Sequence, residues 1–249
     1  MKYLDWLKDA SQLAQEMQVP LNLHLAESYK QAEEQPTQAM ELAGSFSNVL
    51  LLNHVIHLNN EEIAKIAKPD VGISHNPVSN MRLASGIFPF AKMKNAGIKM
   101  GLGLDLGVND TSDFFANMKV AVGLQRVTTL DQNASPTVEE VLRMATLGGA
   151  EVLNMQERIG SLTPGKSADL LTLNPQKVHF APLWDWLSQL VFNARPGDVG
   201  YVFVDSKALK AEGKVLNIDE EELLTEVQQA SDRIQKFLHT RSRNQDTVM

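Results

Sequence analysis

The sequence contains no cysteine, no long run of basic residues and no long apolar run, and each absence removes a class of function. Without cysteine, disulfides, thiol nucleophiles and Cys-based zinc sites are excluded, so a metal ion would need His, Asp or Glu ligands. The net charge of −7 argues against nucleic acid and anionic membrane surfaces as partners. No apolar stretch reaches the length of a membrane span and the first residues do not resemble a signal peptide, so a cytoplasmic location is expected.

The sequence does contain a regular alternation of short apolar runs and helical patterns. Four runs have the length and composition of buried strands, at residues 20–25, 48–55, 71–76 and 98–105. Helical patterns alternate with them, at residues 3–17, 29–44, 59–68, 86–96, 111–126 and 135–153, the last interrupted by Gly148 and Gly149. This alternation predicts an α/β fold of parallel β/α units. Such short strands favour a barrel of the (β/α)8 type over an open sheet, although periodicity alone leaves both open.

The pattern changes after residue 155. Residues 156–217 carry short apolar segments separated by Pro-Gly and Glu-Gly turns, two before residue 175 and two after residue 197. They predict antiparallel strands of a small β domain. Apolar residues at helical spacing over 218–240 predict a long amphipathic helix with a polar tail. The expected division is therefore 1–155 for the β/α region, 156–217 for the small β domain and 218–249 for the helix and tail.

Each of the four predicted strands ends in a side chain that can bind a metal ion or transfer a proton. These side chains are His24, His54, His75 and Asp105. The carboxyl ends of parallel strands form the functional face of β/α folds, so the four groups are expected near one another. Imidazole and carboxylate are good ligands for Zn²⁺ or a similar divalent ion. Glu27, three residues after His24, is placed to act as a proton shuttle.

A structural role is the competing interpretation of these residues. A single histidine at a strand end is more often a structural residue than a ligand. Four strand ends out of four are nevertheless hard to obtain by chance from six histidines. His57, at the predicted start of the following helix, is expected to be structural, and His179 lies outside the β/α region and is expected at the surface.

Five segments of the sequence resemble the amidohydrolase superfamily, in particular its branch of heterocyclic aminohydrolases. That branch includes S-adenosylhomocysteine and methylthioadenosine deaminases, guanine deaminase and the triazine hydrolases. The matching segments are HLAE (24–27), LNHVIHLNNEEI (52–63), SHNPVSNMRLASGIFPF (74–90), GLGLD (101–105) and IGSLTPGKSADLLTL (159–173). The resemblance extends from residue 1 to about residue 217, and its HNPVSN and LASG segments are the most specific to this branch.

The resemblance implies a role for each candidate residue. His24 resembles the metal-binding histidine at the end of barrel strand five, and Glu27 resembles the general acid/base. His54 resembles the strand-six histidine that contacts the attacking water or the substrate. Asp105 resembles the strand-eight aspartate that binds the metal and takes a proton from the water. The motif after strand seven is interpreted as shaping the loop and contacting substrate; its residues are His75, Asn76, Ser79 and Asn80.

The activity implied by the resemblance is metal-dependent hydrolytic deamination of a purine-, pyrimidine- or triazine-like ring. Zn²⁺ is the expected ion and Fe²⁺ the alternative. Water attacks an amidine-like ring carbon, Glu27 protonates the ring nitrogen, and ammonia leaves. The same machinery with chloride or an alkylamine as leaving group is a second interpretation. Leu104 and Leu106 flank Asp105, where the family commonly has threonine and a small residue, so the substrate stays open.

The sequence contains no His-x-His pair, although the metal site of this superfamily begins with one. Its start resembles the helix before barrel strand five, so it is expected to hold only the C-terminal half of a (β/α)8 barrel, strands five to eight, with part of a small β-sandwich domain and a C-terminal helix. A half-barrel would expose strand edges at residues 20–25 and 98–104. A homo-oligomer or a separate N-terminal half would cover them. A catalytically incomplete half-barrel, which lacks the His-x-His motif and binds the metal weakly or not at all, is the third interpretation.

Overall fold

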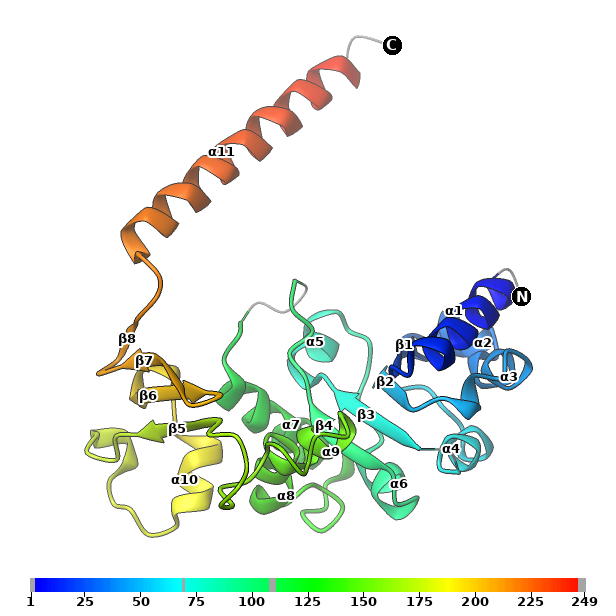
Figure 1. Cartoon of the computed structure of the whole chain (residues 1–249), viewed down its shortest axis with the longest axis horizontal. Helices are drawn as coiled ribbons and strands as arrows, with labels where there is room; N and C mark the ends of the chain where they lie inside the picture. The colour runs from blue at the N-terminus through cyan, green and yellow to red at the C-terminus, as the bar shows by residue number, and fades with distance from the viewer. Residues whose placement is uncertain (1–2, 69, 108–110, 246–249) are drawn as a thin grey trace.

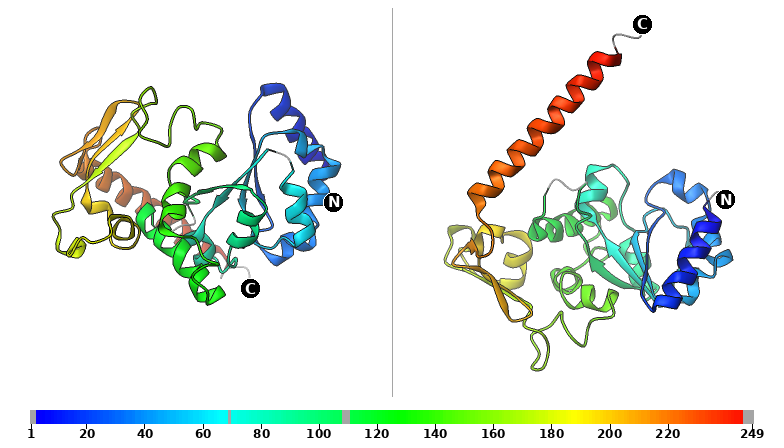
Figure 2. Two further views of the ribbon diagram at one scale, coloured as in Figure 1. Left: turned by 90° about the horizontal axis from the view of Figure 1, so that it is seen from below. Right: turned by 45° about the horizontal axis from the view of Figure 1, so that its top comes forward.

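The computed structural model describes residues 3–68, 70–107 and 111–245, with side chains up to residue 238. Within these ranges two four-stranded sheets organise the chain, one parallel and one antiparallel (Figure 1). The parallel sheet lies toward the N-terminal end of the molecule, and the antiparallel sheet lies at the opposite end. The long last helix projects away from both sheets (Figure 1; Figure 2, right).

The parallel sheet contains the four strands that the apolar runs predict, each a little shorter than predicted. They are β1 (Leu21–Leu25), β2 (Leu50–His54), β3 (Val71–His75) and β4 (Lys99–Leu102), and they lie side by side in chain order. All neighbouring pairs are parallel. Among the described residues the sheet does not close, because β1 pairs only with β2 and β4 pairs only with β3. The predicted unpaired edges are therefore present.

Helices connect these strands and cover the sheet. Those before β4 are α1 (Leu4–Met17), α2 (Tyr29–Glu33), α3 (Pro36–Leu42), α4 (Asn60–Ile66), α5 (Pro77–Arg82) and α6 (Phe90–Asn95), with a 3-10 turn at Ser45–Ser47. Those after β4 are α7 (Phe114–Thr129), α8 (Val138–Met144) and α9 (Leu147–Val152). The main hydrophobic core lies between sheet and helices, where Leu50, Leu52, Ile66, Ile73 and Met93 are fully buried.

Three of the helix predictions need correction. The helix predicted over 29–44 is two helices, because Gln35 has a left-handed backbone (φ 53°) and Pro36 then begins α3. The helix predicted over 86–96 begins only at Phe90. The pattern over 135–153 breaks at Thr146, whose ψ of −101° is not helical, and not at the two glycines, which lie inside α9. A short helix, α5, occupies a segment that had been predicted only as a loop.

The glycines of α9 allow this helix to approach β4 closely. A Cβ on Gly148 would lie 2.7 Å from the carbonyl oxygen of Met100, and a Cβ on Gly101 would lie 2.9 Å from the Cα of Gly149. Both distances are too short for real side chains, so glycine is required on both elements. The Gly-Gly pair is thus a packing feature of the helix.

The antiparallel sheet has the strand order β5 (Leu170–Leu173), β6 (Val199–Val204), β7 (Lys207–Ala211) and β8 (Lys214–Val215). Only one of the two segments predicted before residue 175 forms a strand. The region after residue 197 forms three strands instead of two, because a turn with left-handed residues at Asp205 and Ser206 precedes the predicted Glu-Gly turn.

The connection from β5 to β6 carries a helix that the sequence analysis did not predict, α10 (Trp186–Phe192), between short 3-10 turns at Val178–Phe180 and Pro196–Asp198. It packs against α7 and α8, where Val191 joins a buried cluster with Val122 and Val141. The two sheet regions therefore share a hydrophobic contact, and the predicted division at residue 155 stays a prediction.

The helix predicted over 218–240 is present as α11 (Glu220–Gln245). Its apolar side chains are largely exposed, with Leu224 at 69% and Ile234 at 60%. Residues 246–249 of the predicted tail lie outside the described residues. None of the helices in the described ranges combines the length and the apolarity that crossing a bilayer requires.

Close packing of α9 on the sheet predicts that Gly72→Ala destabilises the fold. A Cβ on Gly72, in β3, would lie 2.7 Å from Val152 Cγ1 and 2.9 Å from the Val152 carbonyl oxygen. We expect a loss of about 2 kcal/mol in the free energy of unfolding, measured by urea denaturation. Gly123→Ala in α7 is the matched control, because its Cβ meets nothing within 4 Å. The better helix propensity of alanine should raise the free energy of unfolding of this variant by at most about 1 kcal/mol. Equal effects of the two substitutions would contradict this packing.

Candidate metal and catalytic site

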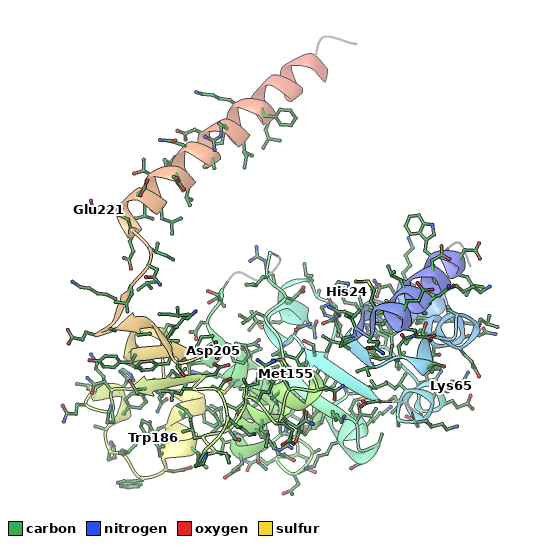
Figure 3. The ribbon with its side chains drawn as sticks, viewed as in Figure 1. His24, Lys65, Met155, Trp186, Asp205 and Glu221 are labelled. Carbon is green, nitrogen blue, oxygen red and sulfur yellow. The ribbon has the colours of Figure 1, made fainter. Side chains whose placement is uncertain are left out.

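The carboxyl ends of β1, β2 and β4 bring three of the predicted site residues together. One ligand atom each from His24, His54 and Asp105 lies within 4.8 Å of the other two. The imidazole rings of His24 and His54 stack, with centroids 5.2 Å apart. Figure 3 shows His24 at the end of β1, on the edge of the sheet. The spatial convergence that the strand-end pattern predicts is therefore present for these three residues.

Glu27 lies beside this cluster, in the loop that follows β1. Its Oε2 is 3.8 Å from His54 Nε2, and Asp105 Oδ2 is 3.9 Å from the same nitrogen. His54 is 1% exposed, whereas the two carboxylates are each 20% exposed. A buried imidazole nitrogen thus faces two carboxylates that remain accessible from solvent.

The backbone at these strand ends adopts an unusual conformation. Ala26, His54, Val55 and Asp105 all have positive φ values, of 47°, 69°, 51° and 56°. Left-handed backbone is unfavourable for residues other than glycine, and most of all for a β-branched residue such as valine. These residues lie at or shortly after the strand ends, where the side chains of His54, Glu27 and Asp105 converge, and such strain commonly accompanies functional sites.

Helix α5 supplies hydrogen bonds that orient two of the clustered side chains. Asn80 Oδ1 lies 2.7 Å from His54 Nδ1, and an amide oxygen can only accept, so Nδ1 carries the proton. The other ring nitrogen of His54, Nε2, is the atom that faces Glu27 and Asp105. Ser79 Oγ donates to Asp105 Oδ2 at 2.5 Å. Both α5 residues are buried, so each acts from beneath the site.

Asn76, which precedes α5, also has a protein partner, because Ser74 Oγ donates to its Oδ1 at 3.1 Å. This pair fills the space over Gly103, where a Cβ would lie 2.2 Å from Asn76 Oδ1 and 2.3 Å from Ser74 Oγ. The pair therefore packs closely against Gly103, and the loop-shaping role of the HNPVSN motif stays a prediction. The substrate contacts predicted for His75, Asn76, Ser79 and Asn80 stay predictions.

His75 does not join the cluster of His24, His54 and Asp105, although it also ends a strand. Its ring is buried and stacks on Phe88, with centroids 4.5 Å apart. Burial disfavours the charged imidazolium and lowers the pKa of His75 to about 3, with a smaller contribution from nearby His54. We conclude that His75 is a neutral, packed ring at neutral pH.

Two further residues near Glu27 had no catalytic role in the sequence analysis. Ser85 Oγ donates to Glu27 Oε1 at 2.9 Å, and His57 Nε2 lies 2.6 Å from the Ser85 carbonyl oxygen. His57 lies in the loop before α4, which begins at Asn60, and not at the start of that helix as predicted. Ser85 belongs to the LASG segment, so the sequence signal was present without an assigned partner.

Comparison with known proteins places this geometry in a family. A sequence model of the amidohydrolase family matches residues 3–214. The chain belongs to the amidohydrolase family. The predicted superfamily is therefore confirmed, together with an α/β fold of the TIM-barrel type that its structural neighbours imply.

Several curated relatives of this amidohydrolase chain carry the same name. It is 35% identical over 237 residues to the 5-methylthioadenosine/S-adenosylhomocysteine deaminase of Desulforudis audaxviator, covering 92% of this chain and 55% of that protein. It is 34% identical to the enzyme of the same name from Syntrophomonas wolfei, again covering 92% and 55%. The chain thus spans about half the length of these relatives.

Solved structures also resemble this chain over about half of their own length. An adenosine deaminase from Xanthomonas campestris with bound zinc superposes with a TM-score of 0.88 at 28% identity, covering 92% of this chain and 54% of that one. A mutant atrazine chlorohydrolase from Arthrobacter aurescens, complexed with zinc and atraton, gives 0.82 at 23% identity, covering 90% and 51%. At that identity the second likeness shows the fold alone.

The clustered donors of this chain fit a divalent cation. Two imidazoles and a carboxylate form a donor set that zinc and related ions accept. The hydrogen bond that His54 Nδ1 donates to Asn80 Oδ1 leaves Nε2 as the nitrogen that faces the cluster, and the bond from Ser79 holds Asp105 toward it. Outer hydrogen bonds of this kind are typical of sites that hold a metal. His54 is close enough to serve as a ligand or to contact water beside the ion.

The buried neutral His75 predicts a specific loss of stability in mild acid. Unfolded histidine takes up a proton below pH 6.5, whereas folded His75 does so only near pH 3. Between these values the unfolded state binds more protons, so the free energy of unfolding falls as the pH falls, by up to about 1.4 kcal/mol per pH unit.

His75→Phe keeps an aromatic ring against Phe88 but cannot be protonated. We measure the free energy of unfolding of both proteins by urea denaturation at pH 7.5, 6 and 5. We expect the value for the variant to rise steadily relative to the value for wild type as the pH falls. Parallel pH profiles for the two proteins would contradict the neutral, buried state of His75.

Proposed function

We propose that this chain carries part of the active site of a metal-dependent hydrolase that deaminates a heterocyclic substrate. The convergence of His24, His54 and Asp105 within 4.8 Å, with Glu27 3.8 Å from His54, carries the proposal. Deaminase relatives at 35% and 34% identity support the reaction class. Zinc in the X. campestris neighbour supports Zn²⁺ as the ion, with Fe²⁺ as the alternative.

The proposed chemistry divides among four side chains. A divalent cation held by His24 and Asp105 would act as a Lewis acid and lower the pKa of a water molecule. Asp105 and His54 Nε2 orient this water, which gives up two protons over the reaction. Glu27 takes one and delivers it to the ring nitrogen next to the attacked carbon; Asp105 takes the other and passes it to the amino group, which departs as ammonia while the ring carbon keeps the water oxygen. His75, Asn76, Ser79 and Asn80 are proposed to shape the substrate-facing loop.

The names of the relatives favour an adenosine-type purine as substrate, with the exocyclic amine as leaving group. Leu104 and Leu106 flank Asp105 where the family commonly has threonine and a small residue, so other heterocyclic rings stay open as substrates. Chloride or alkylamine release by the same residues is the second candidate, supported only by the likeness in fold to atrazine chlorohydrolase. Ammonia and chloride assays on the same substrate panel separate the two.

We further propose that β1 to β4 correspond to strands five to eight of a (β/α)8 barrel and that another polypeptide segment completes it. The open edges at β1 and β4 support this, since parallel sheets are normally buried and closed barrels leave no edges. Exposed apolar side chains on α1 support it as well, among them Trp6 at 80% and Met17 at 62%. A second copy of this chain or an N-terminal half with a His-x-His pair would fit the surface.

Metal binding should depend on the strand-end ligands. We expect elemental analysis of the zinc-loaded, dialysed chain to show close to one ion per chain. His24→Ala and Asp105→Asn should weaken zinc binding at least about tenfold, because each removes a donor from a small set. His179→Gln is the control, since His179 pairs with Asp198 away from the cluster. The solution mass is measured on the same samples. Equal zinc in wild type and His24→Ala would contradict the site.

Catalysis should depend on Glu27 independently of metal binding. With 5-methylthioadenosine, S-adenosylhomocysteine and adenosine as substrates, Glu27→Gln should lower ammonia release by roughly 100-fold or more, because a glutamine cannot transfer the proton. Zinc content should stay unchanged. Glu33→Gln, an exposed position in α2, is the matched control. Unaltered turnover in Glu27→Gln would rule out the proposed proton shuttle.

A further inference from the structure

The segment between α5 and α6, residues 83–89, crosses the carboxyl ends of the strands and is fixed at several points. Ser85 N donates to the Asn80 carbonyl oxygen at 2.9 Å. Phe88 is fully buried against His75, and Gln125 Nε2 donates to the Phe88 carbonyl oxygen at 2.5 Å. The segment has no regular secondary structure, but its backbone is tied to α5 at one end and to α7 at the other.

Ser85 uses this fixed position to hold one oxygen of Glu27. A carboxylate can only accept, so Ser85 Oγ donates to Glu27 Oε1, at 2.9 Å. The other oxygen, Oε2, is the one that lies 3.8 Å from His54 Nε2. The Glu27 backbone is held too, because its N–H donates to Gln31 Oε1 at 2.8 Å. The carboxylate therefore has one anchored oxygen and one oxygen that faces the site.

His57 in turn anchors Ser85. Its Nε2 lies 2.6 Å from the Ser85 carbonyl oxygen, which can only accept, so His57 donates the N–H. The next residue, Gly86, has a φ of 125°, and a Cβ there would lie 2.9 Å from Ile56 Cγ2 and 3.1 Å from His57 Cε1. The opposite side of His57 contacts the Tyr29 ring, with centroids 4.0 Å apart. The loop after β2 and the 83–89 segment are thus locked together.

We propose that Ser85 is a positioning residue for Glu27 and that His57 acts through Ser85. The proposal rests on the proposed function, in which Glu27 moves the proton. Loss of the Ser85 hydroxyl frees the carboxylate to rotate about its side-chain bonds, so Oε2 is aimed at the site in only a fraction of molecules. Misalignment of a proton-transfer group weakens the chemical step more than substrate binding, so kcat should change and KM should not.

The first test measures kcat and KM for ammonia release from 5-methylthioadenosine, S-adenosylhomocysteine and adenosine. Ser85→Ala should lower kcat about 10- to 100-fold and leave KM within about threefold. Ser85→Thr keeps the hydroxyl and should restore most of the rate. His57→Gln keeps a donor for the Ser85 carbonyl oxygen, so its kcat should be higher than that of His57→Leu. Ser47→Ala, at an exposed serine, is the control. A Ser85→Ala enzyme with wild-type kcat, or a KM change of the same size as the kcat change, would overturn the proposal.

The second test needs no activity and reads the Ser85–Glu27 contact in the purified chain. Urea denaturation is measured for wild type, Ser85→Ala, Glu27→Ala and the double variant. If the hydrogen bond holds Glu27, the effect of the double variant on the unfolding equilibrium constant should differ from the product of the single effects by about fivefold. Effects that multiply without any coupling would overturn the proposal.

The two tests separate failure of this proposal from failure of the proposed function. A wild-type chain that releases ammonia from none of the three nucleosides would count against deamination by this chain without a completing segment, while the denaturation cycle would still decide whether Ser85 holds Glu27. Coupling in the cycle together with an unaltered kcat in Ser85→Ala would show a purely structural contact and would overturn the positioning role.

Discussion

The parallel register of β1 to β4 is the constraint on which the candidate site depends. The register pairs Leu25 with His54 and His75 with Leu102, so that the strands end at nearly the same level. Side chains alternate between the faces of a strand, so a slip of one residue would turn each strand-end side chain to the opposite face. Buried Leu50, Leu52 and Ile73 fix this register, because their apolar side chains have no alternative place in the core. The chemistry is thus specified by apolar packing several residues away.

Helix α5 converts that rough placement into a defined geometry. A buried imidazole such as His54 is unfavourable unless its polar atoms are paired, and Asn80 supplies the pair while it selects the tautomer. Ser79 pairs with one oxygen of Asp105 by donating a hydrogen bond to it. The left-handed backbone at His54 and Asp105 opposes folding by about 1 kcal/mol or more each, and these hydrogen bonds help to offset it. The side chains of His54 and Asp105 are therefore held in position by contacts within the protein.

The sequence predicts most of the strands and the convergence of three strand-end residues, because both depend on local periodicity and on a general rule for parallel sheets. It does not predict the hydrogen bonds that Ser79 and Asn80 make with Asp105 and His54. These bonds depend on how the six-residue helix α5 is oriented about its axis, which the sequence pattern does not give. The contact of Ser85 with Glu27 joins residues 58 positions apart and depends on an irregular segment without periodicity. The break at Gln35 has a local signal in Pro36 that helical spacing alone does not register, whereas α10 depends on its packing against the buried cluster of Val122 and Val141. His75 was placed correctly at a strand end, but its packing on Phe88 could not be inferred from position alone.

The chain spans about half the length of its curated relatives, and yet the described residues contain every hydrogen bond discussed for His54, Asp105 and Glu27. The side-chain hydrogen bonds to His54, Asp105 and Glu27 come from α5 and from the segment that follows it. The open edges of the sheet are β1 and β4, and exposed apolar side chains occur on α1 and α11 as well as near the site, where Met81 is 50% and Leu106 is 77% exposed. The edge strands carry His24 and lead to Asp105, whereas the hydrogen bonds to His54 and Asp105 come from α5. A segment that docks against the edges could add ligands or enclose the substrate without having to rebuild this half of the site.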